Sequence, residues 1–396
     1  MLEFHSGSTR MTDGRHAVDE CIALAGDGAE APCSLAIVNA AVGHDLLELS
    51  DRLRERYPKA RVVGCSCAGV VGREGVSETL KDVAVMLVAG DELAVAHVDD
   101  IHGSNSYEGA RELATRLKAA DPYVTMVHLL APGIDIANDA VLAGMKSVLG
   151  PEVTIFGATS SDNMRGVRTM QVVDDRLSEH TAYAVGFSDP TLTVDTQATH
   201  GFIAIGDPMV VTRSQGNRII ELDGAPAWAT YTSRMSLPET ATPADTIPIG
   251  ALAEALPPDL AEEYGNAHIL RVVTHTDSEG ALVYATDCGE GTQLWLTVRD
   301  EELIFSDMDR MTRQMGERAG GAVPVAVFQA DCLARGRRLF NRIIKEELVA
   351  TMQHGFSSDG AVPPWLGMYG FGEYARLGGA NTFHNYTTAL AAIYRA

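Results

Sequence analysis

The sequence predicts an α/β protein with two domains. Segments whose apolar residues recur at helical spacing alternate with short apolar runs typical of buried strands, and this alternation favours a sheet with helices packed on its faces. The same order of elements occurs a second time at an offset of roughly 90 residues, which indicates a duplicated α/β half-repeat with a mixed sheet. Strand patterns dominate the remainder and predict a C-terminal α/β domain with antiparallel strands. The predicted units are half-repeats at about 16–100 and 104–190 inside an N-terminal domain of residues 1–215, followed by a C-terminal domain of residues 216–396.

The first half-repeat begins with a helix at His16, because apolar residues follow it at helical spacing as far as Gly26. A second, amphipathic helix ends before Pro58, since proline cannot continue it. The complete expected order after the first helix is strand 33–40, helix 43–57, strand 61–66 leading into a glycine-rich turn, and strands 81–88 and 92–98.

The second half-repeat has the same pattern, with helix 107–119, strand 123–130, helix 134–149, strand 153–157 and strands 167–173 and 181–187. Two short alignments support a duplication. Gly43-His-Asp-Leu-Leu matches Gly133-Ile-Asp-Ile-Ala, and Val63-Gly64-Cys65-Ser66 matches Phe156-Gly157-Ala158-Thr159. Chance similarity between two βαβ stretches is the alternative interpretation.

The C-terminal part is predicted from strand patterns separated by turn residues. Asp277-Ser-Glu-Gly280 is typical of a hairpin turn. The expected elements are an antiparallel run of strands 191–198, 209–213 and 218–222, hairpin strands 268–274 and 281–285, helices 300–318 and 339–353, and a sheet of strands 323–329, 365–369 and 387–393.

Charge and cysteine content exclude several classes of protein. The net charge of −22 argues against binding to nucleic acid or to an anionic membrane surface. The first fifteen residues lack the apolar region of a secretory signal, and no apolar run is long enough to span a membrane. Six cysteines in 396 residues do not form a disulfide framework, so we expect a cytoplasmic protein with reduced thiols.

Three stretches of the chain resemble one family. Val63-Gly-Cys-Ser-Cys-Ala-Gly69 is similar to the strand–turn signature of FIST N-terminal domains. The junction from Val211 to Ala227, with Gly-Asn and Glu-Leu-Asp-Gly, resembles the one that leads into the FIST C-terminal domain. Cys332-Leu-Ala-Arg335-Gly336, Gly372-Glu373 and His384-Asn385-Tyr-Thr387 are similar to the family's ending.

This resemblance implies a sensory module that binds a small ligand and acts in signal transduction. Amino acids or similar carboxylates are the implied ligands, and one branch of the family is implied to bind haem and sense nitric oxide. No kinase, cyclase or receiver segment is expected after residue 396, so the implied partner is a separate signalling protein such as a histidine kinase.

Two glycine-rich turns are candidate ligand sites. Because each follows a buried strand, the hydroxyls and backbone N–H groups of both could bind an anion at one edge of the sheet. The alternative is a pair of polar turns without a ligand. Cys65-x-Cys67 lacks the second pair that a zinc site requires. The candidate residues are Gly64, Cys65 and Ser66 in the first turn and Gly157, Thr159, Ser160 and Asn163 in the second.

A second candidate site consists of Cys332, Arg335, Glu373, His384 and Asn385. Arginine pairs with carboxylates through two hydrogen bonds, and Glu373 would receive an amine, so these residues suit an amino acid. The alternative is a structural salt bridge between Arg335 and Glu373.

Two other functions remain open from the sequence. Cys332 with His384 and Glu373 would be a nucleophile–base–acid set, although an enzyme is not our main expectation. A haem sensor would need an axial ligand, for which His200 and His384 are the candidates, while His128 is expected to be a core residue. The absence of Cys-x-x-Cys-His excludes covalent haem attachment, and the absence of a phosphate loop and of Gly-x-Gly-x-x-Gly makes ATP and dinucleotide cofactors unexpected.

Overall fold

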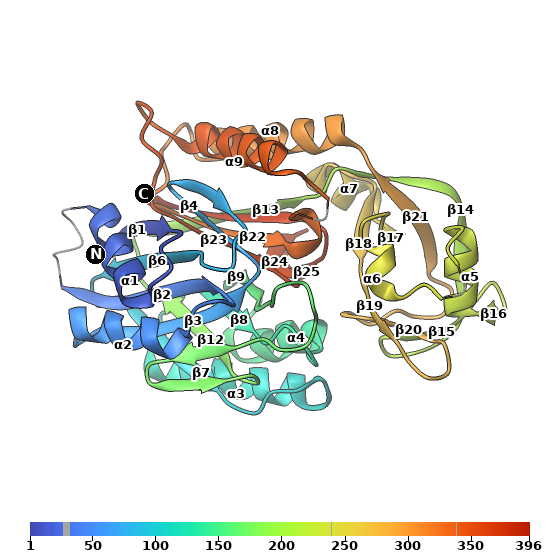
Figure 1. Cartoon of the computed structure of the whole chain (residues 1–396), viewed down its shortest axis with the longest axis horizontal. Coiled ribbons are helices and arrows are strands. Elements are labelled where there is room, and N and C mark those ends of the chain that lie inside the picture. Colours follow the sequence, from blue (N-terminus) through green and yellow to red (C-terminus); the bar gives the residue numbers. More distant parts are fainter. Residues whose placement is uncertain (27–31, 239, 338) are drawn as a thin grey trace.

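A computed structural model describes residues 1–26, 32–238, 240–337 and 339–396 of the chain, and it contains one strand–helix pattern three times (Figure 1). Each unit has the order strand, helix, strand, helix, strand. A short hairpin then precedes the fourth and last core strand of the unit. The first unit is β1 (Glu3–Thr9), α1 (Gly14–Ala25), β2 (Cys33–Ala41), α2 (Leu46–Arg56), β3 (Arg61–Cys67) and β6 (Val83–Ala89). The second is β7 (Leu93–Val98), α3 (Ser106–Ala120), β8 (Met126–Ala131), α4 (Asn138–Leu149), β9 (Thr154–Thr159) and β12 (Ala182–Phe187). The third is β13 (Leu192–Thr199), α8 (Glu301–Arg318), β22 (Ala326–Cys332), α9 (Arg342–Phe356), β23 (Trp365–Gly370) and β26 (Thr388–Arg395).

The strand order inside the sheets is the same in all three units. The core orders are β1-β6-β2-β3, β7-β12-β8-β9 and β13-β26-β22-β23. In each unit only the last two strands named are parallel, and the helix between them makes the crossover that a parallel pair requires. The predicted α/β class with mixed sheets is therefore confirmed.

Each unit gives a hairpin to the sheet of another unit. β4 (Val70–Gly72) and β5 (Gly75–Ser77) of the first unit extend the third sheet, where β4 pairs with β23. β10 (Gln171–Val173) and β11 (Arg176–Ser178) extend the first sheet beside β3, and β24 (Glu373–Leu377) and β25 (Ala380–His384) extend the second sheet beside β9. This cyclic exchange closes the three units into one body.

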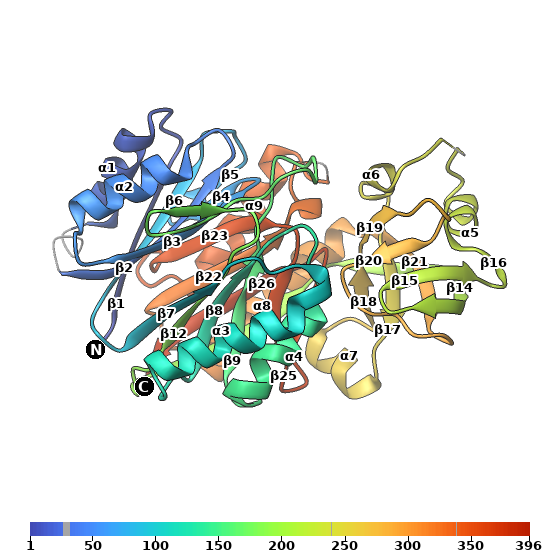
Figure 2. The same ribbon diagram turned by 90° about the horizontal axis from the view of Figure 1, so that it is seen from below.

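The three sheets face a shared core, and each carries its own helices on the outside (Figure 2). The shared core takes apolar residues from all three parallel pairs, including Val63, Phe156, Phe328 and Met368. Three further clusters lie between each sheet and its helix pair, α1 and α2, α3 and α4, or α8 and α9. The core strands are almost continuously apolar in sequence because both faces of each sheet are buried.

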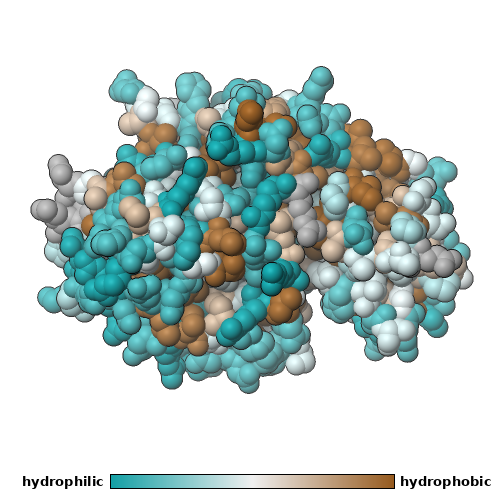
Figure 3. Space-filling model, viewed as in Figure 1, coloured by the Kyte–Doolittle hydropathy of each residue, from teal (hydrophilic) through white to brown (hydrophobic). Residues whose placement is uncertain are grey.

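A lobe of residues 202–299 is inserted between β13 and α8 and projects from one side of the body (Figure 1). Figure 3 shows a notch between this lobe and the body at the lower edge of that view. The lobe consists of β14 (Phe202–Gln215), β15 (Arg218–Leu222), β16 (Ala225–Pro226), α5 (Ala227–Arg234), α6 (Pro243–Thr246), β17 (Leu252–Ala255), α7 (Pro258–Tyr264), β18 (His268–Arg271), β19 (Val273–Thr276), β20 (Leu282–Tyr284) and β21 (Gln293–Arg299).

The structure corrects two strand assignments. The strand expected at 92–98 belongs to the second sheet, as β7 beside β12, rather than to the first half-repeat. The strand expected at 191–198 pairs with the C-terminal β26 and does not run beside 209–213. In both cases neighbours in sequence were expected to pair, whereas short connections carry the chain from one sheet into the next. Gly216, the expected domain boundary, lies in the turn of the β14–β15 hairpin, and the third sheet contains strands from both sides of it.

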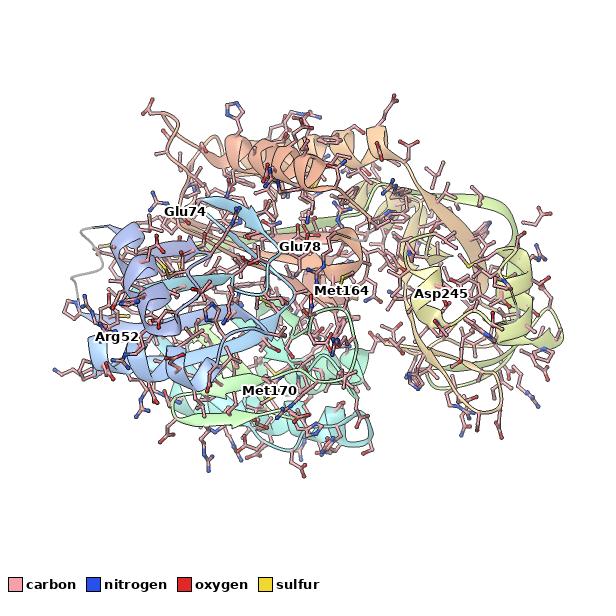
Figure 4. All side chains as sticks on the ribbon, viewed as in Figure 1. Arg52, Glu74, Glu78, Met164, Met170 and Asp245 are labelled. Carbon is pink, nitrogen blue, oxygen red and sulfur yellow. The ribbon has the colours of Figure 1, made fainter. Side chains whose placement is uncertain are left out.

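A buried ion pair fixes the exchanged hairpin of the first unit. Glu78 follows β5 and pairs with Lys345 of α9, and both side chains are almost completely buried. Burial lowers the pKa of Lys345 to about 8. Figure 4 labels Glu78 and Met164, both on the side of the body that faces the lobe. Glu78 also accepts a hydrogen bond from the backbone N–H of Arg337, so it holds the segment that follows the Cys332 motif.

Candidate functional site

The two glycine-rich turns predicted as ligand sites do meet, together with the equivalent turn of the third unit. Ser66 Oγ donates to the Ser161 carbonyl at 2.8 Å, and Ser161 Oγ donates to the Tyr369 carbonyl at 2.5 Å. The Thr159 backbone N–H donates to the Gly372 carbonyl, and Ser160 Oγ accepts from a buried glutamine amide. The polar groups of these strand ends therefore join the three units to one another.

The glycines of these turns allow strands to approach closely. A Cβ atom on Gly64 would lie 2.2 Å from the Val38 carbonyl oxygen. Gly157 has φ +132°, and a Cβ there would lie 2.1 Å from the Leu129 carbonyl oxygen. Cys65 is completely buried in the shared core, where burial raises the pKa of its thiol. Asn163 is half-buried and starts a loop whose backbone N–H groups are bound by Asp162. Binding of a ligand by the residues of these turns remains a prediction.

The motif residues of the C-terminal part come together in the interior. We call Cys332, Glu373, His384, Asn385 and Thr387 the Glu373 cluster. Glu373 and His384 are paired across β24 and β25, so their side chains lie on one face of the sheet. Thr387 Oγ1 donates to Glu373 Oε2 at 2.8 Å, and its carbonyl accepts from the Cys332 backbone N–H at 2.9 Å. The Cys332 thiol lies within hydrogen-bonding reach of Glu373.

Three polar atoms of this cluster lack a hydrogen-bond partner among the residues that the structure describes. They are Glu373 Oε1, His384 Nε2 and Asn385 Oδ1. Glu373 and His384 have no exposed surface and Asn385 has 1%. Buried polar atoms in proteins are nearly always paired, so three in adjacent residues mark an unusual place. The next residue, Tyr386, has φ +59°. This backbone conformation is unfavourable for a residue with a large side chain, and such residues concentrate at functional sites.

The cluster is electrically neutral in this state. Burial raises the pKa of Glu373 well above its usual range, which favours the protonated carboxyl group. Burial lowers the pKa of His384 to about 3, so its imidazole is uncharged. Burial also raises the pKa of the Cys332 thiol, and the neighbouring Glu373 adds to this shift.

Arg335 does not pair with Glu373, so the salt bridge considered from the sequence is absent. Instead Arg335 Nε donates to Asp331 Oδ1 at 3.2 Å, and Nη1 donates to the His200 carbonyl at 2.7 Å. Only 2% of its side chain is exposed. Asp331 lies one turn earlier on the same segment, and sequence reasoning missed it as the partner. The guanidinium is engaged inside the protein, and its contact with a ligand stays a prediction.

The candidate haem ligands do not fit that role in this structure. His200 Nε2 lies 3.0 Å from the His268 carbonyl oxygen, and Nδ1 accepts from the Phe202 backbone N–H at 2.9 Å, so both nitrogens are occupied. His384 keeps Nε2 free but has no exposed surface, and its ring stacks on Tyr264. His128 packs among aromatic rings of the core, as expected.

The lobe supplies two residues that the short motifs did not indicate. Tyr264, at the end of α7, stacks on His384 with ring centroids 5.6 Å apart, and its hydroxyl lies 3.4 Å from His384 Nδ1. Arg271 of β18 lies within electrostatic range of His384 and donates to Glu254 at 3.1 Å, while its Nη1 is buried without a partner. Both residues lie in the sequence between the junction at 211–227 and the motif that begins at Cys332. Nothing in their local sequence marks them as site residues.

An open groove of about 320 Å³ lies beside the cluster, with Tyr264 in its wall. β13, the β24–β25 hairpin and α7 form its sides, and its charged residues have both signs. The polar and charged residues that line it are Thr154, Asp195, Thr196, Gln197, Glu263, Arg318 and Arg376.

Comparison with known proteins identifies the family. The FIST N domain model matches residues 34–225, and the FIST C domain model matches residues 227–376. The chain belongs to the FIST family. FIST domains are small-ligand-binding sensory domains of signalling proteins. None of the described helices, of which α8 has 18 residues, is both long and apolar enough to cross a membrane.

Relatives of this FIST protein are uncharacterized. A protein of Mycobacterium bovis is 25% identical over 401 residues and covers 96% of this chain and 95% of its own. One of Mycobacterium tuberculosis is 24% identical over 340 residues, covering 84% and 83%. Among solved structures, a chorismatase aligns with TM-score 0.35 and 9% identity over 100% of this chain and 99% of its own. A cyanuric acid hydrolase from A. caulinodans aligns with TM-score 0.31 and 12% identity, over 76% and 100%.

The thiol of Cys332 should be unreactive in the folded protein. Burial and the adjacent carboxyl group both oppose formation of the thiolate, which is the nucleophilic form. We expect iodoacetamide to modify Cys332 more than tenfold more slowly than free cysteine at pH 8, as measured by peptide mass spectrometry after a time course. Modification at the rate of free cysteine would contradict this prediction, and only modification faster than free cysteine would restore the nucleophile hypothesis.

Proposed function

We propose that this FIST protein is a cytoplasmic sensor that binds a small polar ligand at the Glu373 cluster and passes the signal to a separate protein such as a histidine kinase. The observation that carries the proposal is the set of three buried, unpaired polar atoms on Glu373, His384 and Asn385. A ligand that pairs them recovers the free energy that their burial costs, which is about 1–3 kcal/mol for each group.

The position of the cluster suggests how binding is transmitted. Tyr264 connects His384 of the body to the lobe, and β18 lies against β25 in Figure 1. Nearby, the Asp287 backbone N–H of the lobe donates to Asp139 at the start of α4 at 3.2 Å. A ligand that changes the contact between Tyr264 and His384 therefore changes how the lobe rests on the body. A partner that contacts both would sense that change.

The compartment is supported by the state of the thiols. All six cysteines are free and buried, as expected for a reducing environment. The net charge of −22 favours a partner with a basic surface.

A thermal-shift screen of small amines, amino acids and carboxylates tests the proposal. A ligand at a hundred times its Kd should stabilise the protein by about 2.7 kcal/mol. We expect Glu373→Gln to weaken binding at least tenfold, because it replaces the carboxyl group without changing its shape. Glu112→Gln, an exposed change on α3, is the matched control and should bind like the natural protein. Equal affinities of the natural protein and Glu373→Gln would exclude this site.

A further inference from the structure

Once Glu373 is ionised, the unpaired atoms of the Glu373 cluster are all hydrogen-bond acceptors. Asn385 Nδ2 donates to the Phe371 carbonyl at 3.4 Å, which leaves the amide oxygen Oδ1 as the free side. Glu373 Oε2 is bound by Thr387, which leaves Oε1. With the proton of neutral His384 on Nδ1, facing the Tyr264 hydroxyl, Nε2 carries a lone pair. A ligand that satisfies all three atoms must donate hydrogen bonds.

The charges of the two arginines near the cluster are paired with carboxylates elsewhere in the described residues. Arg335 is bound to Asp331 and to the His200 carbonyl. Arg271 is bound to Glu254 through Nε, and its Nη1 amino group has no partner among the described residues. The cluster itself therefore matches an ammonium group, which has three donors and no acceptor.

We infer that the ligand of this site is a primary amine, held as its ammonium ion by Glu373 Oε1, His384 Nε2 and Asn385 Oδ1, and that a ligand carboxylate contributes nothing to its affinity. The inference rests on the proposed function and specifies the chemistry of that same site. It also narrows the expectation that the ligand is an amino acid, because the site recognises only the amine group of such a ligand.

The charges around Glu373 permit this pairing. The cations Arg271 and Arg335 are each paired with a carboxylate, Glu254 and Asp331. Tyr264, Cys332, His200 and His384 are uncharged near neutral pH because burial raises the pKa of the first two and lowers that of the two histidines to about 3. Glu373 is protonated in the empty site, so an ammonium ion must displace its proton. Binding should therefore release one proton.

The groove beside Tyr264 provides a route to the buried site. Tyr264 has 2% exposed surface, lines the groove on one side and stacks on His384 on the other. Tyr264 is the residue shared by the groove and the cluster, so the proposed route runs past its ring, and the substituent of the amine would lie in the groove of about 320 Å³.

Three compounds built on the same three-carbon chain, which carries an amine, a carboxyl group or both, test the inference: propylamine, butyric acid and 2-aminobutyric acid. We expect propylamine to raise the melting temperature, 2-aminobutyric acid to do so no more strongly, and butyric acid to have no effect. Calorimetry of propylamine in phosphate and in HEPES, neither of which is a primary amine, should show release of about one proton at pH 7. Glu373→Gln should abolish both the stabilisation and the proton release.

The outcomes separate this inference from the proposed function. Stabilisation by butyric acid, or by 2-aminobutyric acid without propylamine, would overturn the amine assignment and leave the site in place. No stabilisation by any of the three up to tens of millimolar, or binding of propylamine without proton release, would also overturn it. Undiminished binding in Glu373→Gln would refute the site itself.

Discussion

Replacing Asp331 with alanine should lower the free energy of unfolding by about 3–5 kcal/mol, because the change leaves the guanidinium of Arg335 buried without its partner. Asp331 accepts hydrogen bonds from Arg335, Gln329 and Thr388, and its side chain is 6% exposed. Burial raises the pKa of Asp331, and the charge of Arg335 opposes that shift. Urea denaturation at pH 7, followed by circular dichroism, measures the loss.

The double variant Asp331→Ala with Arg335→Met is the control for this prediction. Methionine carries no charge and fills much of the arginine volume, so the double variant should recover at least half of the lost stability. A loss below about 1 kcal/mol in Asp331→Ala, typical of an exposed ion pair, would show that solvent reaches Arg335.

Replacing His128 with leucine should reduce, by about 3 kcal/mol, the free energy of unfolding that the protein loses between pH 7 and pH 4. His128 packs against Phe328 and Phe156, with ring centroids 5.1 and 5.8 Å away, and burial lowers its pKa to about 4. An unfolded histidine titrates near 6.5, so the unfolded state binds the extra proton between about pH 4 and 6.5. Stability therefore falls as the pH falls through this window, by at most about 1.4 kcal/mol per pH unit for one group.

Urea denaturation at pH 7 and pH 4 checks this prediction. Leucine has nearly the volume of histidine, so the two proteins should differ by less than about 1.5 kcal/mol at pH 7. The loss on going to pH 4 should be about 3 kcal/mol smaller in His128→Leu, while His200 and His384 still contribute equally to both proteins. Parallel losses would mean that His128 is charged, or reached by water, in the folded state.

The sequence predicted most local elements but not how they assemble. Helices such as α2 and α8 follow from apolar spacing, and Asp45 and Asp300 cap their first turns. The third unit was missed because residues 202–299 separate β13 from α8, which breaks the repeat. The exchanged hairpins were beyond sequence reasoning, since strands as short as β4 and β10 take their partners from distant segments.

The candidate site was predictable in its members and less so in its contacts. Cys332, Glu373, His384 and Asn385 were candidates from the sequence, which did not show that they meet. The structure pairs Glu373 with His384 across β24 and β25 and places the Cys332 thiol within reach of Glu373, while ligand binding by these residues stays a prediction. The salt bridge between Arg335 and Glu373, considered as an alternative from the sequence, does not form. Arg335 pairs instead with Asp331, a carboxylate only four residues away. Tyr264 could not be found, because its role depends on the inserted lobe folding back onto β25.

A crystal structure of the protein with the compound that stabilises it most tests the central claim directly. We expect the ligand between Tyr264 and the Glu373 cluster, with a donor atom within hydrogen-bonding distance of Glu373 Oε1 and of at least one of His384 Nε2 and Asn385 Oδ1. We also expect a displaced Tyr264 ring. A ligand bound elsewhere, with the three atoms still unpaired and Tyr264 still stacked on His384, would contradict the account.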